Sequence, residues 1–146
     1  MTYTSTASAT FTVAGWDEAT EVDIDGTGTT RGETYWPHRG ITRASVRYTY
    51  RGEIEGSSTV CYVFAYAGKG APILGLEHFT GSIGGHDGSC VFRHTGSHGA
   101  TTVTAHLEVV PGMGTGGLQG LRGEADLTIA GEAPDGYPFE LSYDLS

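Results

Sequence analysis

The sequence has no long hydrophobic run and little positive charge. No stretch of about 18 apolar residues occurs, so a membrane-spanning helix is not expected. Lysine and arginine together number 8 against 17 acidic residues, which gives a formal net charge of −9. Because nucleic acids and anionic membrane surfaces are themselves negative, this charge argues against either as a partner. We therefore expect a soluble protein that binds no nucleic acid and no membrane.

Cysteine is also scarce, and the two residues, Cys61 and Cys90, each lie within a separate apolar run. The first residues of the sequence contain neither a basic segment nor an apolar segment of the kind that secretory signals carry. Isolated cysteines without such a signal favour reduced, buried thiols. From both observations we expect a cytoplasmic protein.

Proline is low at 5 residues, whereas glycine is abundant at 24, so the composition is not that of a disordered chain rich in both. The length suits one domain, 1–146, with a real core. No segment shows a convincing helical period or a capping box. Instead, apolar and polar residues alternate in short segments with frequent turns, which is typical of a β-sandwich or β-barrel. Dense glycine favours the barrel, because glycine permits sharp strand curvature.

The alternation also predicts which faces are buried. It is cleanest along 41–51, where Tyr48 and Tyr50 share a face with apolar residues and arginines occupy the other face. The segment 57–66 is apolar on both faces, and such a strand is covered on both sides. Because a barrel lumen covers only one side, we expect a homo-oligomer. The predicted strands are 7–14, 21–25, 41–51, 57–66, 75–83, 89–96, 100–110, 118–129 and 137–145.

A long polar segment, 26–40, separates the second predicted strand from the third. It contains few alternating residues and includes Trp36 and His38 near its end. We interpret it as an irregular loop at the mouth of a barrel. Loops of this length in compact domains are often functional lids.

A predicted hairpin at 75–96 places an acid and an imidazole on neighbouring strands. A glycine-rich turn joins the two strands, with Glu77 on the first and His94 on the second. Register decides whether they meet, because a slip of one residue turns every side chain to the other face. With a two-residue turn at 85–86, Glu77 lies directly opposite His94, with about 5 Å between the Cβ atoms.

Two other turn positions remain open. A turn at 87–88, where Asp-Gly is the stronger local signal, sets Glu77 opposite His98 but keeps it on the same face as His94. A three-residue turn instead places Glu77 beside Arg93, as an exposed ion pair that contributes little stability. We predict an even register, in which the carboxyl group faces the lumen and its apolar neighbours exclude water.

Three further motifs carry less weight. The glycines at 112–117 form a loose G-x-G pattern, but the residues that follow make a poor helix, so a dinucleotide site is not expected. Cys90, His94 and His98 share a face if their strand is regular, yet no metal-ligand spacing occurs. A nucleophile pair of Cys90 and His94 has no evident third group to activate it. We therefore expect neither a metal nor a cofactor.

Tyrosines are concentrated in two of the predicted strands, 41–51 and 57–66. Such residues are first of all core or subunit-interface residues. If their face lines a cavity, however, they form an apolar pocket with hydroxyl donors, as is usual for small-molecule sites. The residues that we expect to contact a small apolar or aromatic ligand are Tyr48, Tyr50, Tyr62, Tyr66, Phe92 and Trp36.

One glycine-rich stretch resembles the signature of a known family. Residues 109–123, read as V-V-P-G-x-G-T-G-x-L-x-G-L-R-G, resemble that of the DUF3224 family of small bacterial proteins of unknown function. The resemblance extends over most of the sequence, from about residue 10 to 145. Its further matches lie at 42–46, 52–59, 75–77 and 88–96.

The resemblance implies a fold and a set of candidate residues. The family is similar in fold to allene oxide cyclases and plant dirigent proteins, which implies an all-β fold, an eight-stranded antiparallel β-barrel, without a settled activity. The residues that match the family motif and are capable of chemistry are Arg43, Glu55, Glu77, His94 and Arg122.

We predict a barrel that binds a small apolar or aromatic molecule in its lumen. The first interpretation is a cofactor-independent cyclase or isomerase, as the fold relatives suggest, with a polyketide- or oxylipin-like substrate. Glu77 would be the acid or base, His94 or a tyrosine the hydrogen-bond donor, and Arg43 the group that holds an oxyanion. The alternatives are a non-catalytic binding or carrier protein and a purely structural oligomerising module.

Overall fold

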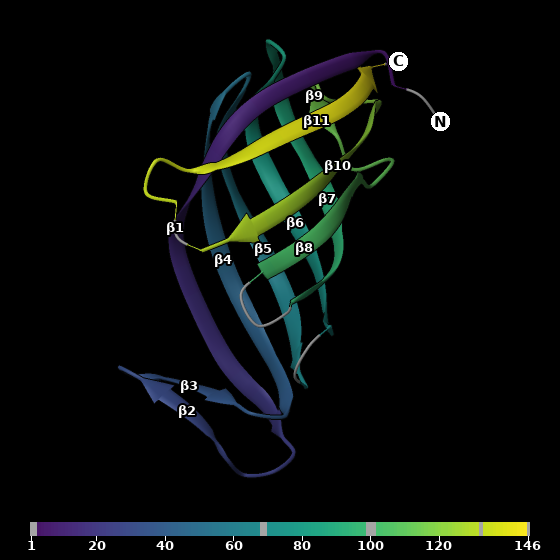
Figure 1. The fold of residues 1–146 in the computed structure, drawn as a ribbon. Helices are drawn as coiled ribbons and strands as arrows, with labels where there is room; N and C mark the ends of the chain where they lie inside the picture. The colour runs from purple at the N-terminus through teal and green to yellow at the C-terminus, as the bar shows by residue number, and fades with distance from the viewer. Residues whose placement is uncertain (1–2, 68–69, 99–101, 132, 146) are drawn as a thin grey trace.

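Eight long antiparallel strands close into a barrel, and a short hairpin lies at one end of it (Figure 1). The computed structural model describes residues 3–67, 70–98, 102–131 and 133–145, and no helix among them is long and apolar enough to span a membrane. The first two residues of the strand predicted at 100–110 lie outside these ranges. The strands of the barrel are β1 (Ser5–Asp23), β4 (Gly40–Gly52), β5 (Ile54–Tyr66), β6 (Ala71–Ile83), β7 (His86–His98), β8 (Thr102–Val109), β10 (Leu121–Ala130) and β11 (Tyr137–Leu145).

The strand order is β6-β5-β4-β1-β11-β10-β8-β7, and β7 pairs again with β6 to close the ring. A two-residue strand, β9 (Thr115–Gly116), adds to the edge of β7. The hairpin consists of β2 (Gly28–Arg31) and β3 (Thr34–Pro37). The predicted eight-stranded antiparallel barrel is confirmed, with one extra strand.

Alternation of polar and apolar residues decides which side of each strand faces the core. Along β4, residues alternate between buried and exposed from Gly40 to Tyr50, with the arginines outside. Burial of each large apolar side chain stabilises the barrel by roughly 1.5–3 kcal/mol. The largest apolar side chains that are fully buried in the core are Phe11, Phe79, Phe92, Ile54, Ile83, Leu107, Leu118 and Leu141.

The first strand is longer than the sequence predicts. The alternation predicts two strands with a break at 15–18, whereas β1 continues through this region and its pairing with β4 shifts between Val13 and Gly15. A β-bulge of this kind adds one residue to a strand and changes its alternation. As a result Val13 faces the lumen before the bulge, and Trp16 and Glu18 face it after the bulge, opposite buried residues of β4.

The segment 26–40 is a regular hairpin rather than the irregular loop that we expected. Gly32 closes its turn with a left-handed φ of 62°. The hairpin is tied to the end of β1, because the Thr20 hydroxyl donates to the Tyr35 carbonyl at 3.5 Å and the Tyr35 hydroxyl donates to Asp23 at 2.5 Å. This second hydrogen bond also raises the pKa of Tyr35.

An apolar strip lies on the outer wall of β5 and β6. Val63 pairs with Leu74 and Cys61 with Leu76, and the three aliphatic side chains are each about half exposed. This strip is the second apolar face that the sequence predicts for 57–66. The hairpin packs against β1 and β4 and leaves the strip uncovered.

We expect the protein to form a homo-oligomer through this strip, because contiguous exposed apolar patches mark interaction surfaces. Light scattering at micromolar concentration should give a mass above that of the monomer, and the double substitution Leu74→Glu and Leu76→Glu should lower it to the monomer. The matched control is Thr128→Glu on the outer wall of β10, which should leave the mass unchanged. A monomeric wild type would contradict this expectation.

Candidate functional site

The hairpin of β6 and β7 turns at Gly84 and Gly85. Their φ angles are 57° and 86°, which is the pair of left-handed residues that a type I′ turn requires. The turn lies one residue earlier than the earliest two-residue turn that we considered, so Glu77 pairs with Phe92 rather than with His94. This difference moves the register by two residues and leaves Glu77 and His94 on the same inner face.

Glu77 lies inside the barrel with 0% of its surface exposed, and three donors surround its carboxylate. The Tyr50 hydroxyl and the Ser58 hydroxyl each lie 2.6 Å from Oε2, and His94 Nε2 lies 2.6 Å from Oε1. Burial of a charge costs several kcal/mol unless it is paired and hydrogen-bonded. The predicted position of Glu77 in the lumen beside His94 is confirmed, and Arg93 pairs instead with Glu108 on the outer wall at 2.9 Å.

A chain of hydrogen bonds continues from His94 to two tyrosines. An ionised carboxylate only accepts, so we assign a hydrogen to His94 Nε2 and leave Nδ1 as the acceptor of the neutral ring. The Tyr62 hydroxyl lies 3.3 Å from Nδ1, and the Tyr48 hydroxyl lies 2.9 Å from that of Tyr62. We call these four residues, Tyr48, Tyr62, His94 and Glu77, the lumen array.

Burial keeps the tyrosines around Glu77 neutral. Desolvation raises the pKa of Tyr48, Tyr50 and Tyr62 above the ordinary value of 10, and the nearby charge of Glu77 raises each of them further. At neutral pH each hydroxyl therefore carries its proton. These groups act as hydrogen-bond donors and not as phenolate nucleophiles.

Gly75 makes room for the contact between Tyr62 and His94. It pairs with Tyr62 on β5 and with His94 on β7, so the three residues face inward side by side. A Cβ atom at this position would lie 2.7 Å from Tyr62 Cδ1, which is too close. We did not predict this residue as part of a site, although a glycine within an apolar strand indicates a close approach of this kind.

A cavity of about 160 Å³ adjoins the lumen array. Glu77, Tyr50 and Phe92 lie deeper in the core and do not line it. Apart from the tyrosines, His94 is therefore the titratable group that a bound molecule would meet. The residues around the cavity are mostly apolar and comprise Val13, Trp16, Tyr48, Tyr62, Phe64, Ile73, His94, Val103, Ala105, Leu127, Ile129 and Tyr137.

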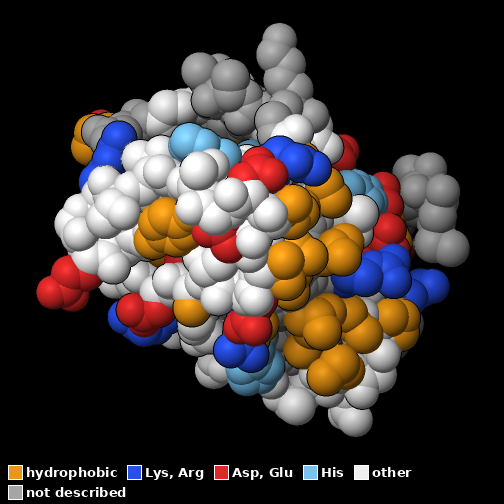
Figure 2. Space-filling model, turned by 90° about the horizontal axis from the view of Figure 1, so that it is seen from below, with side chains coloured by type: hydrophobic (Ala, Val, Ile, Leu, Met, Phe, Trp, Pro, Cys, Tyr) orange, Lys and Arg blue, Asp and Glu red, His pale blue; other side chains and the backbone are white. Residues whose placement is uncertain are grey.

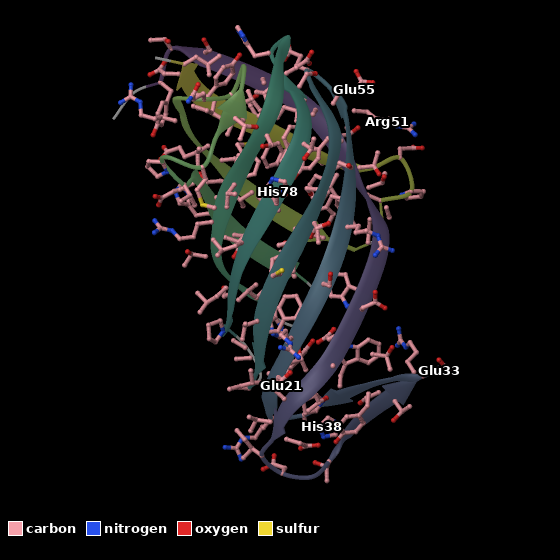
Figure 3. All side chains as sticks on the ribbon, turned by 180° about the vertical axis from the view of Figure 1, so that it is seen from behind. Glu21, Glu33, His38, Arg51, Glu55 and His78 are labelled. Atoms are coloured by element: carbon pink, nitrogen blue, oxygen red, sulfur yellow. The ribbon has the colours of Figure 1, made fainter. Side chains whose placement is uncertain are left out.

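Arg43 lies on the outer wall and not in the lumen. Its guanidinium group is 2.9 Å from the Glu21 carboxylate, and its side chain is 70% exposed. Glu21 lies at the lower end of β1 (Figure 3). Thr42 and Ala44, on either side of Arg43, face inward, so the alternation of β4 turns Arg43 outward. The expected role of Arg43 as an oxyanion holder in the lumen is therefore corrected.

Tyr66 and Trp36 meet at a different carboxylate, that of Glu18. Tyr66 and Thr42 donate hydroxyl hydrogens to Oε2 at 2.5 Å each, and the indoles of Trp36 and Trp16 donate to Oε1 at 2.8 and 3.0 Å. We call these five residues the Glu18 cluster. Sequence reasoning missed Trp16 and Glu18, because it interpreted the interrupted alternation at the bulge as a break between two strands.

The other motif matches and histidines lie away from the array. Glu55 and Arg122 are exposed, as are His38, His78 and His86; Glu55, His38 and His78 are visible in Figure 3. His98 contacts the Ala65 carbonyl at 2.7 Å, and His106 lies on the outer wall beside Asp126. Within the described part of the chain, no group of three or more His, Cys, Asp or Glu side chains is arranged to hold a metal ion.

Cys90 is buried beside the site as expected, whereas Cys61 is exposed, so the expectation of a buried thiol is wrong for Cys61. Desolvation, together with the charge of Glu77, raises the pKa of the Cys90 thiol to about 12. The thiolate is the reactive form of cysteine, so Cys90 behaves as an inert core residue at neutral pH.

Comparison with known proteins decides the family. A family model described as "Protein of unknown function (DUF3224)" matches residues 7–141. The chain belongs to the DUF3224 family. A crystal structure at 1.84 Å of a DUF3224 protein of unknown function from Shewanella oneidensis MR-1 has a TM-score of 0.66 and 23% identity, and the match covers 97% of this chain and 98% of that one.

At this identity the likeness to the Shewanella DUF3224 protein shows the fold alone. No curated protein matches the chain. The similarity to allene oxide cyclases and dirigent proteins stays a prediction, as do the catalytic and binding roles of the residues named above.

Substitution of Glu77 by leucine should destabilise the barrel. Tyr50, Ser58 and His94 would lose their shared acceptor inside a dry core, at a cost on the order of 3–5 kcal/mol. Urea denaturation measures this loss, and the control Glu55→Gln on the exposed wall of β5 should stay within about 0.5 kcal/mol of wild type. A loss as small as that of the control would show that the carboxylate does not hold the strands together.

His106 should make stability depend on pH. Its hydrogen bond to Asp126 at 2.8 Å raises its pKa above 6.5, and the charges of Asp126, Glu108 and Glu124 add to the rise. A group whose pKa is raised on folding stabilises the fold fully at pH values below its pKa in the unfolded chain. This stabilisation is lost as the pH rises through its pKa in the folded protein. The melting temperature of wild type should thus exceed that of His106→Gln more at about pH 5.5 than at about pH 9. Equal differences in melting temperature at the two pH values would contradict this role of His106.

Proposed function

We propose that the barrel binds a small apolar or aromatic molecule in its lumen and isomerises or cyclises it by acid–base chemistry without a cofactor. The observation that carries this proposal is that a mostly apolar cavity adjoins the lumen array. An apolar cavity with a few convergent polar groups is typical of a small-molecule site. The family assignment itself supports only a barrel of unknown function.

His94 is the group best placed to move a proton. It lines the cavity, whereas Glu77 lies behind it and hydrogen-bonds to Nε2. Glu77 thereby holds the ring in one tautomer and stabilises the imidazolium that forms when Nδ1 accepts a proton, as the acid does in catalytic triads. In this proposal Glu77 is a positioning residue, and His94 takes the acid–base role that we first expected of Glu77.

Tyr48 and Tyr62 replace Arg43 as the groups that stabilise negative charge on oxygen. Both line the cavity, and burial keeps both hydroxyls protonated. Donors already aimed at a developing oxyanion act strongly in a site without water, because the low dielectric weakens screening. A ligand oxygen that accepts a hydrogen bond from the Tyr62 hydroxyl would also free His94 Nδ1 from its contact with that hydroxyl.

The proposed step is a proton shift beside a carbonyl group. His94 Nδ1 removes a proton from the α-carbon, the electron pair of the broken C–H bond forms a C=C bond, and the carbonyl electrons move to the oxygen held by Tyr62. Where the substrate carries a C=C bond next to that α-carbon, as in a β,γ-unsaturated carbonyl compound, the resulting dienolate also carries negative charge at the γ-carbon. The imidazolium returns the proton there, so that the C=C bond moves into conjugation with the carbonyl group. The product is an isomer with no net oxidation or reduction. Attack of the same enolate on an electrophilic carbon within the molecule gives a ring instead, and the imidazolium proton then passes to the atom of the electrophile that takes up the displaced electron pair.

A non-catalytic carrier is the alternative function. The observation that favours it is that both oxygens of Glu77 and both ring nitrogens of His94 already have hydrogen-bond partners. In that case the array holds the strands together, and Tyr48 and Tyr62 only orient the ligand.

Hydrogen–deuterium exchange separates the two functions. We expect wild type to accelerate loss of the α-proton signals of cyclohexanone and cyclohex-2-enone in heavy water, followed by proton NMR. Glu77→Gln should lower the rate by about 10²-fold or more, because the base loses its orienting partner. Binding of the same ketones, measured by NMR titration, should change little in that variant.

The matched control is His106→Gln, which removes a histidine from the outer wall and should exchange at the wild-type rate. If the ketones bind but exchange no faster than in buffer, the catalytic part is wrong and the carrier function is favoured. If they neither bind nor exchange, both functions are contradicted.

A further inference from the structure

We infer that Trp16 sets the size of the molecules that enter the lumen and limits them to a single ring. This inference rests on the proposed function, because it requires a ligand in the cavity. Trp16 lines the cavity while 46% of its surface is exposed, so its indole stands between the cavity and solvent. Seen from the end that carries the hairpin, the molecule exposes a broad group of apolar side chains (Figure 2).

The indole begins a series of aromatic rings that leads inward to the proposed base. Trp16 stacks on Phe64 with 5.8 Å between centroids and 8° between planes, and Phe64 stacks on Tyr62 at 5.0 Å and 25°. Tyr62 in turn meets the His94 ring edge-on at 5.2 Å. Flat apolar rings pack well against such a wall in offset-stacked or edge-on arrangements. The wall therefore favours a planar ring as the ligand.

The Glu18 cluster holds the indole in this position. Trp16 Nε1 donates to Glu18 at 3.0 Å, and hydrogen bonds from Trp36, Thr42 and Tyr66 fix the same carboxylate. Hydrogen bonds to an ionised acceptor are among the stronger ones in proteins. The indole is thus held from one side by Glu18 and packed on another by a ring, so it acts as a fixed wall.

The volume of the cavity sets the limit. The cavity measures about 160 Å³. An apolar cavity of about 150 Å³ in another protein binds one benzene molecule, so this cavity has room for about one ring. A fused two-ring molecule needs more space, which has to come from the wall that faces solvent. Among the lining residues that are large and apolar, Val13 and Trp16 are the two with nearly half of their surface exposed. Trp16 is the larger, so its removal opens the cavity most.

Calorimetric titration with phenol and 2-naphthol tests this inference. Wild type should bind phenol more tightly than 2-naphthol, and Trp16→Ala should shift the ratio of the two dissociation constants toward 2-naphthol by about tenfold or more.

The matched control is Trp36→Ala, which removes another indole from the Glu18 carboxylate but not from the cavity wall. It should leave the ratio near that of wild type. Trp16→Phe keeps a ring against Phe64 and should give an intermediate ratio, which tests the inference even if Trp16→Ala does not fold.

The outcomes of this titration distinguish a failure of the inference about Trp16 from a failure of the proposed function. If wild type binds 2-naphthol as tightly as phenol, or if neither Trp16 variant changes the ratio, Trp16 does not set the size limit although the lumen site stands. Equal shifts in Trp16→Ala and Trp36→Ala would assign the effect to the Glu18 cluster and overturn the role of Trp16. If neither probe binds to any of the proteins, the proposed function fails together with the inference.

Discussion

The interior of this barrel depends on a carboxylate that has been removed from water. Glu77 is buried on all sides, and its charge is tolerated because Tyr50, Ser58 and His94 direct donors at it from three other strands. Each donor reaches the carboxylate only at one register, since a slip of one residue would turn it to the outer wall. The register of the neighbouring strands β4, β5, β6 and β7 is therefore fixed by a polar group as well as by the apolar core.

Much of this arrangement is predictable from the sequence, because successive side chains of a β-strand point to opposite faces of the sheet. Alternation along β4 to β7 places Tyr48, Tyr62, Glu77 and His94 on one inner surface before any contact is known. The same alternation places Arg43 outside, as the structure does. Assigning Arg43 to the site came from its match to a family motif, and the physical pattern was the better guide.

The rest was not predictable because it depends on single residues that break the period. A bulge near Gly15 adds one residue to β1 and turns Trp16 and Glu18 inward, although the local sequence indicates a break. The turn of the β6–β7 hairpin forms at Gly84 and Gly85 and not at the stronger Asp-Gly signal. Both turns leave Glu77 and His94 on one face, so alternation does not choose between them, and the two glycines accept the left-handed angles of the turn that forms.

Desolvation links stability and chemistry in the deep part of the lumen but not at its opening. The burial that keeps Tyr48 and Tyr62 protonated is the same burial that makes Glu77 dependent on its donors. A substitution there changes both the fold and any reaction, because an unpartnered polar group is left in a dry core. Near Trp16 the wall is about half exposed, so water reaches a polar group that a substitution leaves without its partner. Changes in ligand preference without loss of the fold are therefore accessible at the opening, whereas the lumen array is constrained by the barrel that it helps to hold.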